Sequence, residues 1–144
     1  MEWYFMNIKK AADMFELTVD TLRYYERVGV IPPVHRNNSG YRDYATNDLN
    51  WIYLVKSLRK AGLSIESLIE FSTLAQLREK QNVEEAQKRV LGDQLQQLDN
   101  KIAEMNEVRD LLEYKINTYD EHIKKFKAGE VDPENIEKLW ERKK

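Results

Sequence analysis

Apolar side chains recur at helical spacing through the first sixty residues of this chain. Residues 8–17 place apolar positions about one helical turn apart, which predicts a first short helix. Thr18 is a candidate N-cap for a second helix, because its hydroxyl can accept a backbone N–H from the first turn. Gly29 is the expected end of that helix. Two short helices joined by a few residues predict a helix-turn-helix.

A short β-ribbon, or wing, is predicted to follow. Pro32 and Pro33 stop the second helix, because proline has no backbone N–H and clashes with the preceding turn. The stretch 34–44 then alternates partly in polarity and contains the turn signal Asn38-Ser39-Gly40. This turn would pair residues 34–36 with residues 41–44.

Two further helices are predicted after the wing. Thr46 is the candidate cap of a third helix, whose apolar positions recur every three residues until Gly62. Ser64 is the candidate cap of a fourth helix, with Ile65 and Leu68 facing inward. The chain contains only five glycines and three prolines, which agrees with a mainly helical fold.

A heptad pattern runs from residue 91 to residue 126, in alternating steps of four and three. Ten of its eleven positions are apolar, and a helix of this length would measure roughly 54 Å. A lone helix cannot bury such a face, so we expect a partner helix, most simply that of a second copy. Alternatively, the helix folds back on its own domain. The seam consists of Leu91, Leu95, Leu98, Ile102, Met105, Arg109, Leu112, Ile116, Tyr119, Ile123 and Phe126.

Arg109 is the polar exception, and it lies next to the midpoint of this seam. In an antiparallel homodimer it could approach its symmetry mate and control the register, provided that acidic side chains compensate the charges. It could instead extend outward while Val108 and Leu111 fill the gap. Beyond the seam, Asp132 and Pro133 predict a short final helix carrying Ile136, Leu139 and Trp140 on one face.

Composition narrows the possible functions. The formal net charge is −2, so the chain is not basic overall, and the absence of cysteine excludes disulfides, thiolate metal sites and thiol chemistry. No nucleophile–base pair, phosphate loop or metal-ligand spacing predicts an enzyme, and we expect no cofactor; His35 and His122 are isolated. Without a signal peptide or an apolar span, a cytoplasmic protein with no membrane partner is the default expectation.

Residues 21–44 combine tyrosines and arginines in a way that suits a polyanion. Arginine donates two hydrogen bonds to phosphate from a planar fork, and tyrosine offers a hydroxyl and a flat ring. The alternative is that one of Tyr24 and Tyr25 packs in the core, while Arg27 and Arg36 are ordinary solvated charges. The residue pattern alone leaves both interpretations open.

Three separated motifs in this region carry a family resemblance. The sequences "TLRYYERVGVIPP", "NNSGYRDYATNDL" and "LRKAGLSIESL" resemble the amino-terminal domain of MerR-family transcriptional regulators over about residues 7–75. The resemblance implies a winged helix-turn-helix head, a long antiparallel coiled-coil dimerisation helix and a short C-terminal helix. Glu16 stands where the family often has glycine, and Ser67 replaces a glutamate that would complete a capping box after Ser64.

The resemblance also implies which residues contact DNA. Asp20 occupies a position that is often basic or polar in the family; its carboxylate would repel phosphate but could accept a hydrogen bond from a cytosine amino group. The wing and the end of the third helix would contact the DNA backbone. The implied DNA-binding residues are Thr18, Asp20, Thr21, Arg23, Tyr24, Tyr25, Arg36, Tyr41, Arg42, Tyr44, Arg59 and Lys60.

By the same resemblance, we expect a homodimer that binds a palindromic promoter operator and untwists it for RNA polymerase in response to an unknown signal, for which a small molecule is one candidate. The expected domains are a DNA-binding domain at 7–77, a dimerisation helix at 82–127 and a tail at 128–144. Two alternatives remain: a coiled-coil adaptor whose head binds protein, and an architectural DNA-binding protein that needs no ligand. Salt-dependent binding to duplex DNA would separate the adaptor from the other two.

Overall fold

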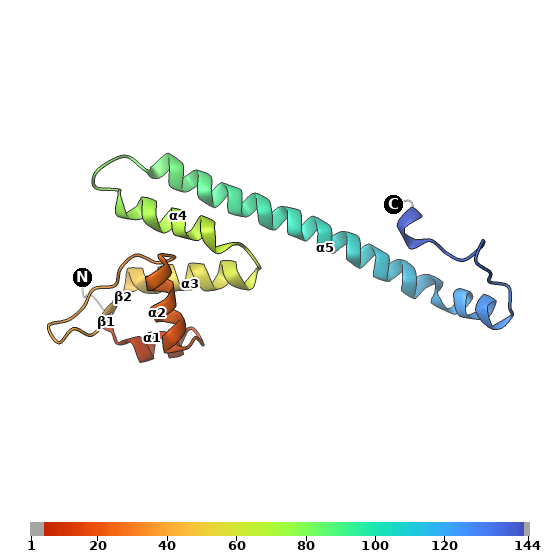
Figure 1. Cartoon of the computed structure of the whole chain (residues 1–144), viewed down its shortest axis with the longest axis horizontal. Helices are drawn as coiled ribbons and strands as arrows, with labels where there is room; N and C mark the ends of the chain where they lie inside the picture. Colours follow the sequence, from red (N-terminus) through yellow and green to blue (C-terminus); the bar gives the residue numbers. More distant parts are fainter. Residues whose placement is uncertain (1–4, 143–144) are drawn as a thin grey trace. The chain divides into compact units, whose positions relative to one another are not determined.

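The computed structural model describes residues 5–142 and divides into two compact units, Met1–Asn100 and Lys101–Lys144. The fold is mainly helical, as predicted, and the longest helix begins in the first unit and ends in the second (Figure 1). The elements are β1 (Phe5–Met6), α1 (Ile8–Met14), α2 (Val19–Val28), β2 (Tyr44–Ala45), α3 (Thr46–Lys60), α4 (Ile65–Gln76), α5 (Glu84–Lys127) and a 3₁₀ turn (Leu139–Glu141).

The predicted helix-turn-helix is confirmed, and its helix ends follow the local sequence. Thr18 caps α2, and its hydroxyl accepts a hydrogen bond from the Thr21 backbone N–H at 3.0 Å. Gly29 ends α2 in the left-handed conformation, with φ of 83°. The turn between α1 and α2 is strained, because Glu16 has a left-handed backbone, with φ of 57°, and a residue with a Cβ atom adopts this conformation at a cost.

The core of the first unit lies between α1, α2, α3 and α4. Leu22 of α2 and Ile52 of α3 are completely buried in it. The loop after α2 contributes to the same core, because Val30 and Ile31 are also buried. The remaining buried members are Ala11, Ala12, Phe15, Tyr25, Val34, Tyr44, Leu49, Val55 and Leu68. A core of this kind fixes α2 while leaving its opposite face in solvent.

The wing forms, but with less pairing than a regular ribbon. Its two arms meet in a single β-bridge between Arg36 and Arg42, flanked by a hydrogen bond from the Asp43 N–H to the His35 carbonyl at 2.7 Å. The base of the second arm, β2, instead pairs antiparallel with β1. The sequence did not predict this contact, which closes the sheet with residues that precede α1.

The helices after the wing begin differently from the prediction. Ala45, not Thr46, occupies the N-cap position of α3, and the Asp48 carboxylate accepts a hydrogen bond from the Ala45 backbone N–H at 2.8 Å. Ser64 does occupy the N-cap of α4, but its side chain makes no capping hydrogen bond. This agrees with the absence of a glutamate at position 67.

The first turns of α5 pack against α4 within the first unit (Figure 1). Val83, Gln87, Val90 and Gln94 are buried. The Gln87 side chain donates to the Phe71 carbonyl at 3.3 Å and accepts from the Arg78 guanidinium at 2.8 Å. The alternative in which the long helix folds back on its own domain therefore holds for these first turns.

The tail departs from the predicted final helix. The Asp132 carboxylate accepts hydrogen bonds from the backbone N–H groups of Glu134 and Asn135, at 2.8 and 2.9 Å, but only a turn follows. A 3₁₀ turn forms later, and Trp140 within it is 80% exposed. The cap was identified correctly, but Pro133 begins no α-helix.

Candidate nucleic-acid interface

The outer face of α2 exposes a compact set of polar and aromatic side chains. Asp20, Arg23 and Tyr24 are exposed, and Thr21 is half-buried beside them. The hydroxyls of Thr18 and Thr21 lie 2.8 Å apart, so the two side chains support each other at the start of the helix. These residues are therefore accessible together on one helix that the core holds in place.

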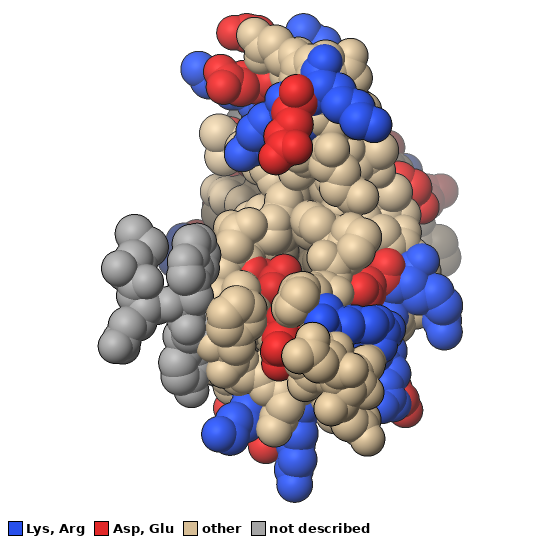
Figure 2. Space-filling model, turned by 90° about the vertical axis from the view of Figure 1, so that its left-hand side faces the viewer, with Lys and Arg blue, Asp and Glu red and all other residues tan. Residues whose placement is uncertain are grey.

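A groove of about 590 Å³ lies between the start of α1, the face of α2 and the wing. It brings Arg23 of α2 together with Arg36 and Tyr41 of the wing, residues that lie far apart in the sequence. Arg36 donates to the Gly40 carbonyl at 3.0 Å, which holds its guanidinium along the wing. Figure 2 shows this end of the chain, where Lys and Arg side chains lie over the lower half of the face and again at its top, with Asp and Glu side chains between them.

Arg42 forms an ion pair within the head, and its contact with DNA stays a prediction. Its Nε donates to Oε1 of Glu26 at 2.5 Å, and only 19% and 14% of the two side chains are exposed. The other oxygen of Glu26 accepts the Val34 backbone N–H at 2.8 Å. One carboxylate therefore ties the end of α2 to both arms of the wing.

Two predicted DNA contacts, Tyr25 and Tyr44, are core residues. Tyr25 is 7% exposed and Tyr44 is completely buried, so neither side chain is available to DNA in this structure. Burial raises the pKa of Tyr44 to about 12, more than the nearby Arg42 charge lowers it. Burial also raises the pKa of Tyr25, against the effect of Arg59. Both phenols are held neutral.

The end of α3 carries the last two predicted contacts, Arg59 and Lys60, and both are exposed. Arg59 donates to the Leu63 carbonyl at 3.2 Å, which satisfies a backbone group just after the helix end. This bond occupies part of the guanidinium and leaves further donors for a phosphate.

Asp20 places a negative charge in the middle of this basic surface. Its carboxylate lies 3.3 Å from the Arg23 guanidinium, and both side chains are largely exposed. Exposed pairs of this kind contribute little to stability. The pair can therefore open at low cost, which leaves Arg23 available for a phosphate or a base.

The seam of α5 is exposed along most of its length in the single chain. Arg109 extends to the solvent, 76% exposed and 3.8 Å from Glu113. Leu98 and Ile123 are half-buried. The other apolar positions are exposed: Leu91, Leu95, Ile102, Met105, Leu112, Ile116, Tyr119 and Phe126.

We also searched the described part of the chain for a metal site and for a membrane-spanning helix. No group of three or more metal-ligating side chains occurs among residues 5–142. No helix within the same range is long and apolar enough to cross a membrane. His122, which looked isolated in the sequence, lies 2.9 Å from a Glu137 carboxylate oxygen.

Sequence reasoning missed two residues that shape this surface. The sequence analysis assigned no role to Glu26, although it belongs to the Arg-Tyr-Tyr-Glu motif that carried the resemblance. Asn37 organises the tip of the wing, where its side-chain oxygen accepts the N–H groups of Ser39 and Tyr41 at 2.9 and 3.1 Å. The only indication of this role in the sequence was that Asn37 lies next to the turn sequence Asn38-Ser39-Gly40.

Comparisons with known proteins agree with this geometry. Residues 6–73 match the family described as "MerR HTH family regulatory protein". The HTH-type transcriptional regulator AdhR of Bacillus subtilis is 54% identical over 93 residues, which span 65% of each chain. The matched part is thus slightly less than two thirds of that relative's length.

Two solved structures resemble the chain over most of its length. One is described as a MerR family transcriptional regulator from Listeria monocytogenes; it is 41% identical, with a TM-score of 0.73, covering 88% of this chain and 99% of that one. The other is HiNmlR, a MerR family regulator lacking the sensor domain, bound to promoter DNA. It is 28% identical, with a TM-score of 0.71, covering 82% of this chain and 92% of that one.

Proposed function

The chain belongs to the MerR family of transcriptional regulators, and we propose that it binds a palindromic promoter operator as a homodimer and distorts the DNA at its centre. The observation that supports this most is the groove that joins Arg23 of α2 to Arg36 and Tyr41 of the wing. Helix α2 would enter the major groove, and the wing would follow the neighbouring backbone. The promoter DNA bound to HiNmlR supports the same kind of target for this chain.

Within this proposal, the exposed side chains divide by their chemistry. Arg23, Arg36 and Tyr41, together with Arg59 and Lys60, would contact phosphates and position the protein. Thr18, Thr21, Tyr24 and Asp20 face outward from the first turns of α2, which is where a recognition helix meets base edges. Asp20 would favour a cytosine amino group over an acceptor on the base.

The homodimer is supported by the exposed apolar seam of α5. A helix face with Leu112, Ile116 and Tyr119 more than half exposed is unfavourable in water and suits a second helix. A palindromic operator would follow from two-fold symmetry, because each copy would present one α2. We assign residues 7–77 to DNA binding, 82–127 to dimerisation and 128–144 to the tail.

Distortion of the operator would use the rigid attachment of the wing to α2. Two heads that grip the backbone can bend or untwist the DNA between them, at a cost of roughly 1–6 kcal/mol supplied by the added contacts. In a promoter whose elements are too far apart for RNA polymerase, this change would bring the elements into register. An effector would act by favouring the distorting state.

The test is selection of the operator by the full chain from a randomised duplex library, followed by affinity measurement across salt concentrations. A palindromic consensus and an affinity that falls steeply with salt are expected. Arg23→Ala should weaken binding, whereas Arg89→Ala, the same change on the exposed surface of α5, should not. Affinity that is weak and independent of salt would favour the protein-binding adaptor instead.

A further inference from the structure

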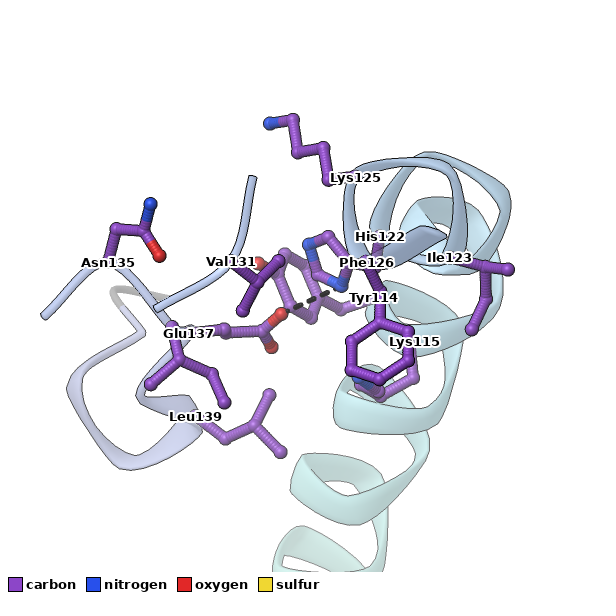
Figure 3. A pocket seen from close by; sticks show the side chains of 11 residues that line it. Tyr114, Lys115, His122, Ile123, Lys125, Phe126, Val131, Asn135, Glu137 and Leu139 are labelled. Carbon is purple, nitrogen blue, oxygen red and sulfur yellow. Dashed lines mark ion pairs between the residues drawn. The ribbon is translucent and has the colours of Figure 1, made fainter. Parts of the chain in front are cut away.

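A second hollow, remote from α2 in the sequence, lies entirely within the second unit. It has a volume of about 480 Å³ and is formed by the last turns of α5 and the tail that follows them. Figure 3 shows Val131 and Leu139 of the tail on one side of the hollow and Phe126 of the helix on the other; Ile123 also belongs to the lining. This volume falls in the range of small-molecule pockets, about 300–1,000 Å³.

The carboxylate of Glu137 lies between these walls. Both of its oxygens are shielded, although 23% of the whole side chain is exposed, and within residues 5–142 Oε1 has no hydrogen-bond partner. Its neighbour is His122, whose Nδ1 lies 2.9 Å from Oε2 and is a charged partner only when the imidazole is protonated (Figure 3). A carboxylate can accept about four hydrogen bonds, so most of the capacity of this group is unused.

Such a group is unfavourable unless something satisfies it. A shielded carboxylate with one partner retains part of its desolvation penalty, because apolar walls offer no hydrogen bond to its second oxygen. A ligand that brings a positive charge and N–H donors would remove that penalty. The surrounding Phe126, Val131 and Leu139 would at the same time cover an apolar body.

The two lysines at this site do not favour an anionic ligand. Lys125 pairs with Glu121 at 3.4 Å, and in Figure 3 its side chain points away from Glu137. Lys115 also lines the hollow, but an anion held there would share it with the shielded Glu137 charge. Like charges at close range in a poorly solvated site repel strongly.

We propose that this hollow binds a small organic cation, an amine with an apolar body, whose ammonium group hydrogen-bonds to Glu137. The aromatic ring of Tyr114 belongs to the same lining and already holds one cation, the Arg142 guanidinium, 5.0 Å from the ring centroid. A role of this amine as the effector of the regulator rests on the proposed function. The binding of the amine to the hollow does not rest on it, because the hollow lies outside the DNA-binding head.

The test is isothermal titration of the full chain, without DNA, with three probes that share one skeleton: phenylbutylamine, phenylbutanol and phenylbutyrate. The amine should bind on the order of tenfold more tightly than the alcohol, because one charge-assisted hydrogen bond is gained. The acid should bind more weakly than the alcohol. Operator affinity is measured separately, so a failure of the DNA proposal leaves this result interpretable.

Two matched variants locate the effect. Glu137→Gln should remove the preference for the amine while leaving the affinity for the alcohol unchanged, which shows that the hollow is intact. Glu130→Gln, the same change on an exposed residue of the tail, should behave like the parent chain. Glu137→Asp, which keeps the charge, should keep the preference for the amine even where the glutamine variant disturbs the tail.

Three results would overturn the proposal. The first is equal binding of the amine and the alcohol, and the second is an amine preference that survives Glu137→Gln. The third is no binding of any probe.

Discussion

The position of Arg42 leads to a specific prediction about why this residue matters for DNA binding. Because its Nε is held by Glu26, we predict that Arg42→Ala weakens operator affinity by releasing the wing, without removing a phosphate contact. Removing one partner of a fully buried pair costs about 3–5 kcal/mol. The remaining exposure of 19% and 14% lowers our expectation to roughly 2–3 kcal/mol of unfolding free energy.

Two assays separate a role of Arg42 in holding the wing from a role in binding phosphate. Urea denaturation measures the loss of stability, which Glu26→Gln should reproduce because it leaves Arg42 without its charged partner. Operator affinity across salt concentrations counts phosphate contacts, since each contact contributes about 0.9 to the slope of log K against log salt. Arg42→Ala should leave this slope unchanged, whereas Arg23→Ala should reduce it by about 0.9.

The opposite pattern would refute this reasoning. If Arg42→Ala lowered the salt slope by about one contact and left the urea midpoint unchanged, Arg42 would bind phosphate and its link to Glu26 would be incidental. The double variant provides a control. Its destabilisation should be smaller than the sum of the two single effects, because both changes remove the same ion pair.

Three further substitutions test individual features of the head. Glu16→Gly should stabilise the chain by about 0.5–1 kcal/mol in thermal unfolding, because glycine relieves the left-handed backbone but gains freedom in the unfolded state. Tyr44→Phe should raise stability by up to about 1 kcal/mol and leave operator affinity unchanged, because within residues 5–142 the buried hydroxyl has no hydrogen-bond partner. Burial raises the pKa of Asp48 above 3.8, so its contribution to stability is greatest below that value and declines as pH rises through the raised pKa. Asp48→Asn should therefore remove this decline in urea titrations at increasing pH, while its amide oxygen still accepts the Ala45 N–H.

The features that the sequence predicted well are those determined by neighbouring residues. Thr18 and Gly29 define α2 through contacts within one turn of the chain, so their chemistry can be read without knowing the fold. The seam of α5 is equally local, because a heptad pattern depends only on spacing. The resemblance then supplied the order of the motifs, which the family match over residues 6–73 confirms.

The features that the sequence did not predict depend on contacts between distant segments. Strand β1 pairs with β2 across about forty residues, and neither two-residue strand carries a pattern of its own. The Glu26–Arg42 pair joins residues sixteen positions apart, and in the sequence both look like surface charges. The cap at Asp132 could be predicted from the sequence, but a cap alone does not supply the apolar packing that a short helix needs.

Helix α5 shows how one repeat can serve two surfaces. Val83, Gln87, Val90 and Gln94 have the same spacing as the seam, but they are offset from it by one residue. One residue rotates a side chain by about 100° around a helix, so this buried face and the exposed face that begins at Leu91 do not compete. Because half of the buried positions are glutamines, a search for apolar periodicity finds only the second face. The same helix can therefore be anchored in its own head while its seam remains available to a second copy.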